Sequence, residues 1–156
     1  MKLYLDVCCL NRPFDDQSQN RVRLEAEAVL SILELAGSGA LEIIGSDIID
    51  DELSQMPDNE RCEKVGLLLA LASSHVSLTP AIERRAVELV EWNITPLDAM
   101  HLASAESARA DYFLTTDDDL LRKAGRRQSG LKVKVDNPAK WLIQETTDEN
   151  GHAQSR

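Results

Sequence analysis

YFLTTDDDLLRKA, at residues 112–124, joins a short apolar run to a helical pattern through consecutive aspartates. The apolar run at 112–115 has the length of a buried strand, and the pattern at 118–124 favours a short helix. Asp117 lies between them, just beyond the carboxyl end of the predicted strand. A strand that leads directly into a helix is the repeating unit of parallel α/β folds.

Strands and helices alternate through the rest of the chain as well. Further strands are expected at residues 2–5, 41–45, 75–78 and 131–135, and further helices at 21–36, 58–72, 81–91 and 97–109. Ser46 or Asp47 caps an additional helix that carries Glu52, and a last helix begins at Pro138. This alternation predicts an α/β fold, a three-layer α/β/α sandwich with a four- to five-stranded parallel sheet.

Length and composition fit one domain. The chain has 156 residues, of which 43% are apolar but only 4% aromatic, so aliphatic side chains must fill the interior. That composition suits helices packed on a parallel sheet. We expect one domain over residues 1–145, followed at 146–156 by a polar, disordered tail.

The charge of the chain bears on its partners. A net charge of −10 argues at first against nucleic acid, because contacts with phosphate need lysine and arginine. Basic residues nevertheless crowd one region, where they either follow a phosphate backbone or form an ordinary solvated face. They are Arg122, Lys123, Arg126, Arg127, Lys132, Lys134 and Lys140.

The sequence carries no signal for export or membrane insertion. Its three cysteines, Cys8, Cys9 and Cys62, form no C-x-x-C pair and cannot all pair in disulfides, which fits a reducing cytosol. Asp6 interrupts the apolar start, and no apolar run reaches the length of a membrane span. We therefore expect a soluble, cytoplasmic protein.

Acidic residues from distant parts of the sequence converge on one edge of the predicted sheet. Asp6 ends the first strand, Asp117 follows the fourth, and Asp98 lies in the first turn of a helix that starts at the same edge. Glu52 lies in the helix that leaves the second strand. Parallel sheets bind ligands beyond the carboxyl ends of their strands, so this edge is the candidate site.

Each acid also has a purely structural explanation. Asp98 follows Thr95 by three residues, which is a helix-capping arrangement, and Asp117 can cap the helix after it. Glu52 can be an exposed helix residue, and Asp6 can order a turn. Convergence on one edge favours a shared role, although any one acid alone would not.

Carboxylates that converge repel one another and raise each other's pKa unless a cation is present. Mg²⁺ or Mn²⁺ prefers carboxylate and water oxygens, whereas no suitably spaced cysteines or histidines favour zinc. Such a metal can activate a water and stabilise charge on a phosphodiester.

Four segments resemble the PIN domain family, and most closely its VapC-type toxin ribonucleases. These segments are LDVCCLNRP at 5–13, SDIIDDEL at 46–53, TPLDAMHLASA at 95–105 and FLTTDDDLL at 113–121. The resemblance extends to about residue 145. The last two elements in this order are specific, whereas either alone is weak.

The resemblance implies an endoribonuclease that depends on Mg²⁺ or Mn²⁺ and cleaves single-stranded RNA. Asp6, Glu52, Asp98 and Asp117 match the catalytic and metal-binding acids of the family, and Asp119 is an additional possible ligand. The implied substrate contacts are Asn11 and Thr116, to which we add Arg122 and Arg126 from the basic region. A homodimer and an antitoxin that inserts into the cleft are also implied, with Val65, Leu68, Leu69 and Leu71 as either part of that surface or ordinary core.

Two features depart from this simple picture. The segment 8–19 is longer and more polar than the usual turn, so it is either a surface loop capped by its own aspartates or a place where Asp15 or Asp16 approaches the metals. His101 follows Asp98 by three residues and could orient a carboxylate. A packing histidine satisfied by the backbone is the preferred interpretation.

Other classes of protein fit less well. Cys8 stands where an aspartyl phosphatase needs its second aspartate, a receiver domain needs an acidic pair that is missing, and no G-x-x-x-x-G-K-[ST] or G-x-G-x-x-G motif is present. Flap nucleases carry an arch for which this chain has no insert. A non-catalytic RNA-binding or scaffolding protein with the same fold remains the alternative function.

Overall fold

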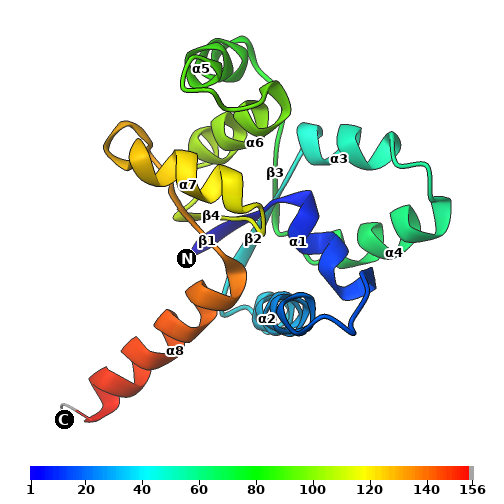
Figure 1. The fold of residues 1–156 in the computed structure, drawn as a ribbon, viewed down its shortest axis with the longest axis vertical. Helices are drawn as coiled ribbons and strands as arrows, with labels where there is room; N and C mark the ends of the chain where they lie inside the picture. The colour runs from blue at the N-terminus through cyan, green and yellow to red at the C-terminus, as the bar shows by residue number, and fades with distance from the viewer. Residues whose placement is uncertain (155–156) are drawn as a thin grey trace.

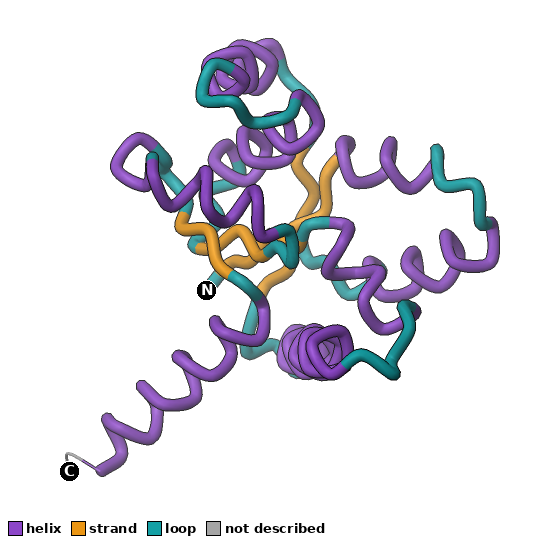
Figure 2. The backbone as a smooth tube through the Cα atoms, in the orientation of Figure 1, coloured by secondary structure: helices purple, strands orange, loops and turns teal. Residues whose placement is uncertain are grey.

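The computed structural model describes residues 1–154, and the side chains of residues 1–148. Its sheet has five parallel strands in the order β3-β2-β1-β4-β5 (Figures 1 and 2). The strands are β1 (Lys2–Leu5), β2 (Glu42–Ser46), β3 (Ser74–Val76), β4 (Tyr112–Leu114) and β5 (Lys134–Asp136). The helices are α1 (Val7–Asn11), α2 (Asn20–Gly37), α3 (Asp47–Ser54), α4 (Asn59–Leu69), α5 (Pro80–Val90), α6 (Pro96–Ser107), α7 (Asp118–Arg126) and α8 (Pro138–Gln154), with 3-10 turns η1 (Arg12–Phe14) and η2 (Gln128–Gly130).

The central strand is β1, and the order of the strands reverses beside it. From β1 the chain adds β2 and β3 on one side, and then crosses back to place β4 and β5 on the other. Residues 3–5 of β1 pair in register with residues 112–114 of β4. The carboxyl ends of these two strands frame the point at which parallel sheets hold ligands. The predicted parallel α/β sandwich is confirmed, with five strands.

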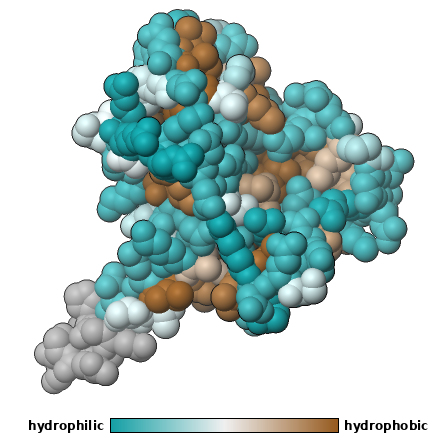
Figure 3. All heavy atoms as spheres, viewed as in Figure 1, coloured by the Kyte–Doolittle hydropathy of each residue, from teal (hydrophilic) through white to brown (hydrophobic). Residues whose placement is uncertain are grey.

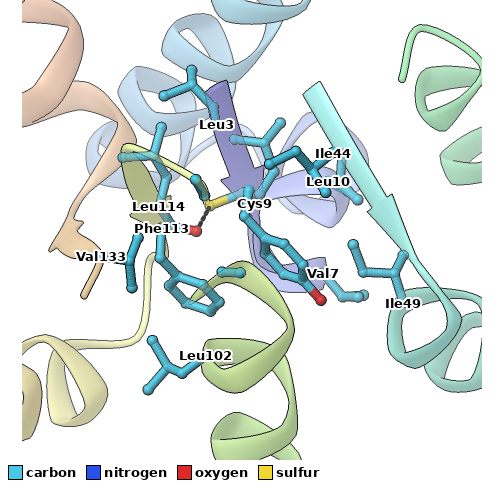
Figure 4. Close-up of a cluster of buried hydrophobic side chains, with 14 of the residues drawn as sticks. Leu3, Val7, Cys9, Leu10, Ile44, Ile49, Leu102, Phe113, Leu114 and Val133 are labelled. Carbon is cyan, nitrogen blue, oxygen red and sulfur yellow. Dashed lines mark hydrogen bonds between the residues drawn. The ribbon is translucent and has the colours of Figure 1, made fainter. Parts of the chain in front are cut away.

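Aliphatic side chains form the core, as the composition predicted. Phe113 and Leu102 are fully buried between the sheet and α6, whereas the buried Leu3 points to the opposite face of the sheet, which α2 covers (Figures 1 and 4). The Cys9 thiol donates a hydrogen bond to the Leu114 carbonyl at 3.2 Å, so Cys9 acts as a small core residue that ties α1 to β4 (Figure 4).

Side-chain caps set the start of the helices that flank the site. The hydroxyl oxygen of Ser46 accepts the N–H of Ile49 at 3.0 Å, and that of Thr95 accepts the N–H of Asp98 at 3.3 Å. Each cap satisfies a backbone donor that the first turn of a helix leaves unpaired. Both caps were predicted, because serine or threonine precedes a helical pattern in each case.

Helix α1 was not predicted, because Asp6 was expected to order a turn and residues 8–19 to form a loop. The helix has five residues, too few to show a helical period in the sequence. It begins because the Asp6 carboxylate accepts the N–H of Val7 at 2.9 Å.

Residues 146–154, where a disordered tail was expected, continue the last helix in the structure. Helix α8 continues through this segment to Gln154 and leads away from the sheet (Figure 1). Glu149, Ala153 and Gln154 are good helix formers, and extending a helix that has already started costs less than starting one. The Thr146 hydroxyl also donates to the Leu142 carbonyl at 2.8 Å. Residues 155 and 156 lie outside the described part.

The surface is mostly polar, with local apolar patches such as the one on α5 around Val87 and Val90 (Figure 3). Among the described helices, none is both long enough and apolar enough to span a bilayer.

Candidate metal centre

Asp6 is the innermost acid of the site. It follows β1, and only 6% of the residue is exposed. Its Oδ1 accepts the N–H of Val7 at 2.9 Å, while its Oδ2 accepts the hydroxyl of Thr115 at 2.9 Å and the thiol of Cys8 at 3.4 Å. Burial raises the pKa of Asp6, and the charge of Glu52 raises it further.

Glu52 and His101 complete the inner cluster. One ligand atom from each of Asp6, Glu52 and His101 lies within 4.8 Å of the others. The Glu52 side chain is 25% exposed, and its Oε1 lies 3.5 Å from Nε2 of the fully buried His101. The two acids predicted from β1 and from α3 therefore meet, and a histidine lies beside them.

Asp98 lies at the start of α6, half-buried, with its backbone N–H bonded to Thr95. Burial raises the pKa of Asp98, and the charges of Asp6 and Asp117 add to the effect. These charges act on Asp98 because the three carboxylates share one edge of the sheet. Asp98 does not belong to the tight cluster around Asp6.

Asp117 is exposed at the outer side of the site, where it caps α7. Its Oδ1 accepts the backbone N–H groups of Asp119 at 2.9 Å and Leu120 at 3.3 Å. Asp117 therefore does cap the helix after it, as its structural explanation predicted. Because both bonds use one carboxylate oxygen, the role leaves the other oxygen for an ion or for solvent.

Thr115 connects Asp6 to the backbone of Asp117. The sequence analysis named Thr116, and not Thr115, as the threonine of the site. The Thr115 hydroxyl oxygen donates to Asp6 and accepts the backbone N–H of Asp117 at 3.2 Å. Thr116 is almost buried and contributes its backbone, with its N–H directed to Cys8 Sγ and its carbonyl to Arg21. Strand alternation was the available signal, because Thr115 lies two residues after the buried Phe113.

Asp119 does not join the acids. Its carboxylate is held by Arg122 at 2.7 Å and Lys123 at 2.8 Å, and the hydrogen bonds from Lys123 and Arg122 lower the pKa of Asp119. We therefore keep Asp119 out of the ligand set that we propose. The same pairing occupies Arg122, whereas Arg126 lies exposed in the last turn of α7.

Asn11, a predicted substrate contact, is the last residue of α1. Its Oδ1 is buried and has no hydrogen-bond partner among the described residues.

The polar segment after α1 folds on itself and away from the acids. Asp15 pairs with Arg12 at 3.0 Å and with Arg61 of α4 at 2.7 Å. Asp16 accepts the N–H of Ser18 at 3.0 Å. The preferred interpretation, a loop ordered by its own aspartates, agrees with these contacts, and Arg61 in addition ties the loop to α4.

The PIN domain family model matches residues 3–126, which includes all four predicted acids. The chain belongs to the PIN domain family. Two solved structures resemble this PIN domain in fold: VapBC2 from Rickettsia felis bound to a DNA fragment from its promoter, and VapBC-1 from nontypeable Haemophilus influenzae. Each is 15% identical, the alignments cover 88% of this chain and 98% of the other, and the TM-scores are 0.58 and 0.56. No curated protein matches the chain.

The donor set of this PIN domain fits a hard divalent cation. Carboxylate oxygens of Asp6 and Glu52 lie close together, and Asp98 and Asp117 add negative charge at the same edge. The raised pKa values of Asp6 and Asp98 show that the folded chain disfavours these charges without a counter-ion. A bound Mg²⁺ or Mn²⁺ would remove that cost, because it prefers oxygen ligands.

Proposed function

We propose that this PIN domain is a metal-dependent endoribonuclease that cleaves phosphodiester bonds of single-stranded RNA. The observation that carries the proposal is the buried carboxylate of Asp6 beside Glu52, at the point where strand order reverses. PIN domains are generally nucleases, and the acids gathered at this edge of the sheet support the same chemistry here.

The residues of the chain have distinct parts in this proposal. Asp6 and Glu52 would hold Mg²⁺ or Mn²⁺, and the bonds from Val7 and Thr115 keep Asp6 in one orientation. Asp98 and Asp117 would bind the ion or its waters from the outer side. When bound, such an ion lowers the pKa of a water and stabilises charge on the phosphate.

The basic region supplies the other half of a nucleic-acid site. Arg126 is exposed in the last turn of α7, the helix that Asp117 caps. Neighbouring cations are partly occupied, since Arg127 lies over the Trp92 ring at 5.5 Å and Lys134 over the Tyr112 ring at 5.6 Å. Arg126 is therefore our leading candidate for a phosphate contact from α7.

The first test concerns the acids themselves. We expect Asp6→Asn and Asp98→Asn to slow cleavage of labelled single-stranded RNA in Mn²⁺ by at least about a hundred-fold, because each removes charge that holds or orients the ion. Asp16→Asn is the matched control, since Asp16 is exposed and an asparagine oxygen can still accept the N–H of Ser18.

Cleavage that survives in both site variants, or that persists in excess EDTA, would contradict metal-dependent catalysis by these acids. RNA that binds the wild-type protein but is never cut would support the alternative, a non-catalytic RNA-binding or scaffolding protein.

Partners follow from the resemblance to VapC-type toxins. We propose that the protein forms a homodimer and is held inactive by an antitoxin segment. The structure buries Val65 of α4 in the core, so the antitoxin surface cannot use it, whereas Leu67 is 74% exposed and Leu71 40%. Light scattering of the purified chain checks the dimer, since a monomer at micromolar concentration would contradict it.

A further inference from the structure

A row of three buried polar side chains lies behind the metal centre. The hydroxyl oxygens of Ser46 and Tyr4 are 2.7 Å apart, and the Tyr4 hydroxyl oxygen is 2.7 Å from Nδ1 of His101. All three residues are completely buried, and they come from β2, β1 and α6. The row ends at Nε2 of His101, which has no hydrogen-bond partner among the described residues and lies 3.5 Å from Oε1 of Glu52.

This finding corrects the interpretation of His101 as a packing residue satisfied by the backbone. Its Nδ1 bonds to a side chain that lies 97 positions away in the sequence. The imidazole is also held by its packing, because the Tyr4 ring meets it edge-on at 5.8 Å and stacks on Phe113 at 5.3 Å. The ring of His101 thus has one orientation relative to Glu52.

The number of hydrogens on Ser46, Tyr4 and His101 determines which group donates in each of the two hydrogen bonds between them. Two contacts join the three groups, and the Ser46 and Tyr4 hydroxyls already supply one hydrogen for each contact. A hydrogen on Nδ1 would be a third, and one of the three would then be buried without an acceptor, which folded proteins avoid. Ser46 must therefore donate to Tyr4, and Tyr4 to Nδ1, so that the hydrogen of a neutral imidazole lies on Nε2.

Glu52 is the group that this hydrogen faces. Both oxygens of Asp6 already accept hydrogen bonds, but the Glu52 carboxylate accepts none from the described residues. An unpaired N–H and an unpaired carboxylate oxygen thus lie opposite each other. Their 3.5 Å separation exceeds a good hydrogen bond, and a small rotation of the partly exposed Glu52 side chain would close it.

We propose that His101 is a positioning residue for Glu52: the hydrogen bonds from Ser46 to Tyr4 and from Tyr4 to Nδ1 leave a hydrogen on Nε2, and His101 donates that hydrogen to the Glu52 carboxylate. It is not a metal ligand, because in this form Nε2 has no free electron pair. The metal part of this inference rests on the proposed function, since Glu52 is assigned there as a ligand. Partners that orient a ligand typically contribute ten- to hundred-fold to metal affinity.

The first experiment tests the direction of the hydrogen bonds and needs neither metal nor activity. Long-range proton–nitrogen correlation spectra of the full chain at neutral pH distinguish the two neutral forms of an imidazole. The signals of His101 are identified by their absence from His101→Asn. We expect a bare Nδ1 and a protonated Nε2, and a hydrogen on Nδ1 would overturn the proposal.

The second experiment measures Mn²⁺ affinity from the free-ion signal in electron paramagnetic resonance. His101→Asn keeps a polar group near Tyr4 but cannot reach Glu52, so we expect affinity to fall by about ten-fold or more. His101→Gln places an amide N–H toward Glu52 and should recover part of that loss. Asp16→Asn is the control, because Asp16 is exposed and its carboxylate accepts the N–H of Ser18 within its own loop.

Tyr4→Phe keeps the stack on Phe113 but removes the hydroxyl that selects the form of His101. It should weaken Mn²⁺ binding and give signals of both neutral forms, which makes it a second test if His101→Asn does not fold. Equal affinity in wild type, His101→Asn and Tyr4→Phe would overturn the inference alone. A wild type that binds no Mn²⁺ would instead overturn the proposed function, and the spectra would still decide the hydrogen-bond direction.

Discussion

Asp6 accepts hydrogen bonds at both carboxylate oxygens, and yet its pKa is raised. The reason is its burial, since two hydrogen bonds do not replace the water that an ionised carboxylate loses on folding. Because the folded chain binds this proton more tightly than the unfolded chain, the ionised form destabilises the fold at neutral pH. That penalty begins to fall as the pH drops below the raised pKa of Asp6, and it is gone below the ordinary pKa of an aspartate.

We therefore predict that Asp6→Asn makes the metal-free protein more stable at neutral pH. The advantage of the variant should shrink as the pH is lowered, because the wild-type carboxyl then becomes neutral as well. Urea denaturation in EDTA at several pH values measures the difference. A variant that is less stable than wild type at neutral pH would show that the bonds of Asp6 outweigh the cost of its burial.

Single residues also show where sequence reasoning reaches its limit. Asp6 and Glu52 could be placed together because topology alone brings their elements to one edge. The choice of Thr115 over Thr116, and the link from Tyr4 to His101, depend on which way individual side chains point. Their partners lie about a hundred positions away, so no local pattern in the sequence announces them.

Two helices of the fold begin in the same way but differ in what they carry. Thr79 caps α5 and Thr95 caps α6, each just before a proline, with hydroxyl oxygens 3.2 and 3.3 Å from the capped N–H groups. Helix α6 presents Asp98 in its first turn, whereas α5 presents no acid of the site. Variants of the two caps therefore distinguish an effect on helix stability, which both should show, from an effect on the position of Asp98, which only the Thr95 variant should show.

We predict that Thr95→Ala and Thr79→Ala each lower the free energy of unfolding by about 1 kcal/mol, the usual value of such a cap. Only Thr95→Ala should also weaken Mn²⁺ binding, because the first turn of α6 holds Asp98. Calorimetric titration with Mn²⁺ makes the comparison. Equal losses of affinity in the two variants would mean that stability, and not placement, governs binding.

Elements with a clear period were predicted, and elements without one were not. The strands and the helices from α2 to α7 show alternation or a helical stripe, together with caps of serine, threonine or aspartate. Helix α1 is too short to show a period, and it exists because Asp6 caps it. The polar end of α8 resembled a loose tail, since composition alone does not reveal that an established helix can continue.

On the scale of the whole molecule, Glu25 connects three regions around the sheet. It is buried in α2, and it accepts from Arg12 at 3.0 Å, from Arg21 at 3.4 Å and from the side-chain amide of Asn137 at 2.6 Å. Arg21 continues the network to Asp118 at the start of α7. Helices α2, α7 and α8 are thereby fixed relative to one another beside the candidate metal centre.

We predict that Glu25→Ala destabilises the fold by about 2–3 kcal/mol, less than for a fully buried pair because Arg12 and Arg21 retain some access to water. Glu27→Ala, an exposed position of the same helix, is the control and should change stability by less than about 0.5 kcal/mol. Thermal unfolding followed by circular dichroism measures both. A similar loss in the two variants would exclude a special role for Glu25.

The pairing of β1 with β4 also governs when the candidate site can assemble during synthesis of the chain. The backbone N–H of Asp6 bonds to the carbonyl of Leu114 at 2.9 Å. Asp6 can therefore form this bond only after most of the chain has left the ribosome. A growing chain exposes Asp6 early but has neither Thr115 nor Asp117 beside it. Under the proposed ribonuclease function, fragments released prematurely by the ribosome are accordingly expected to leave RNA uncut.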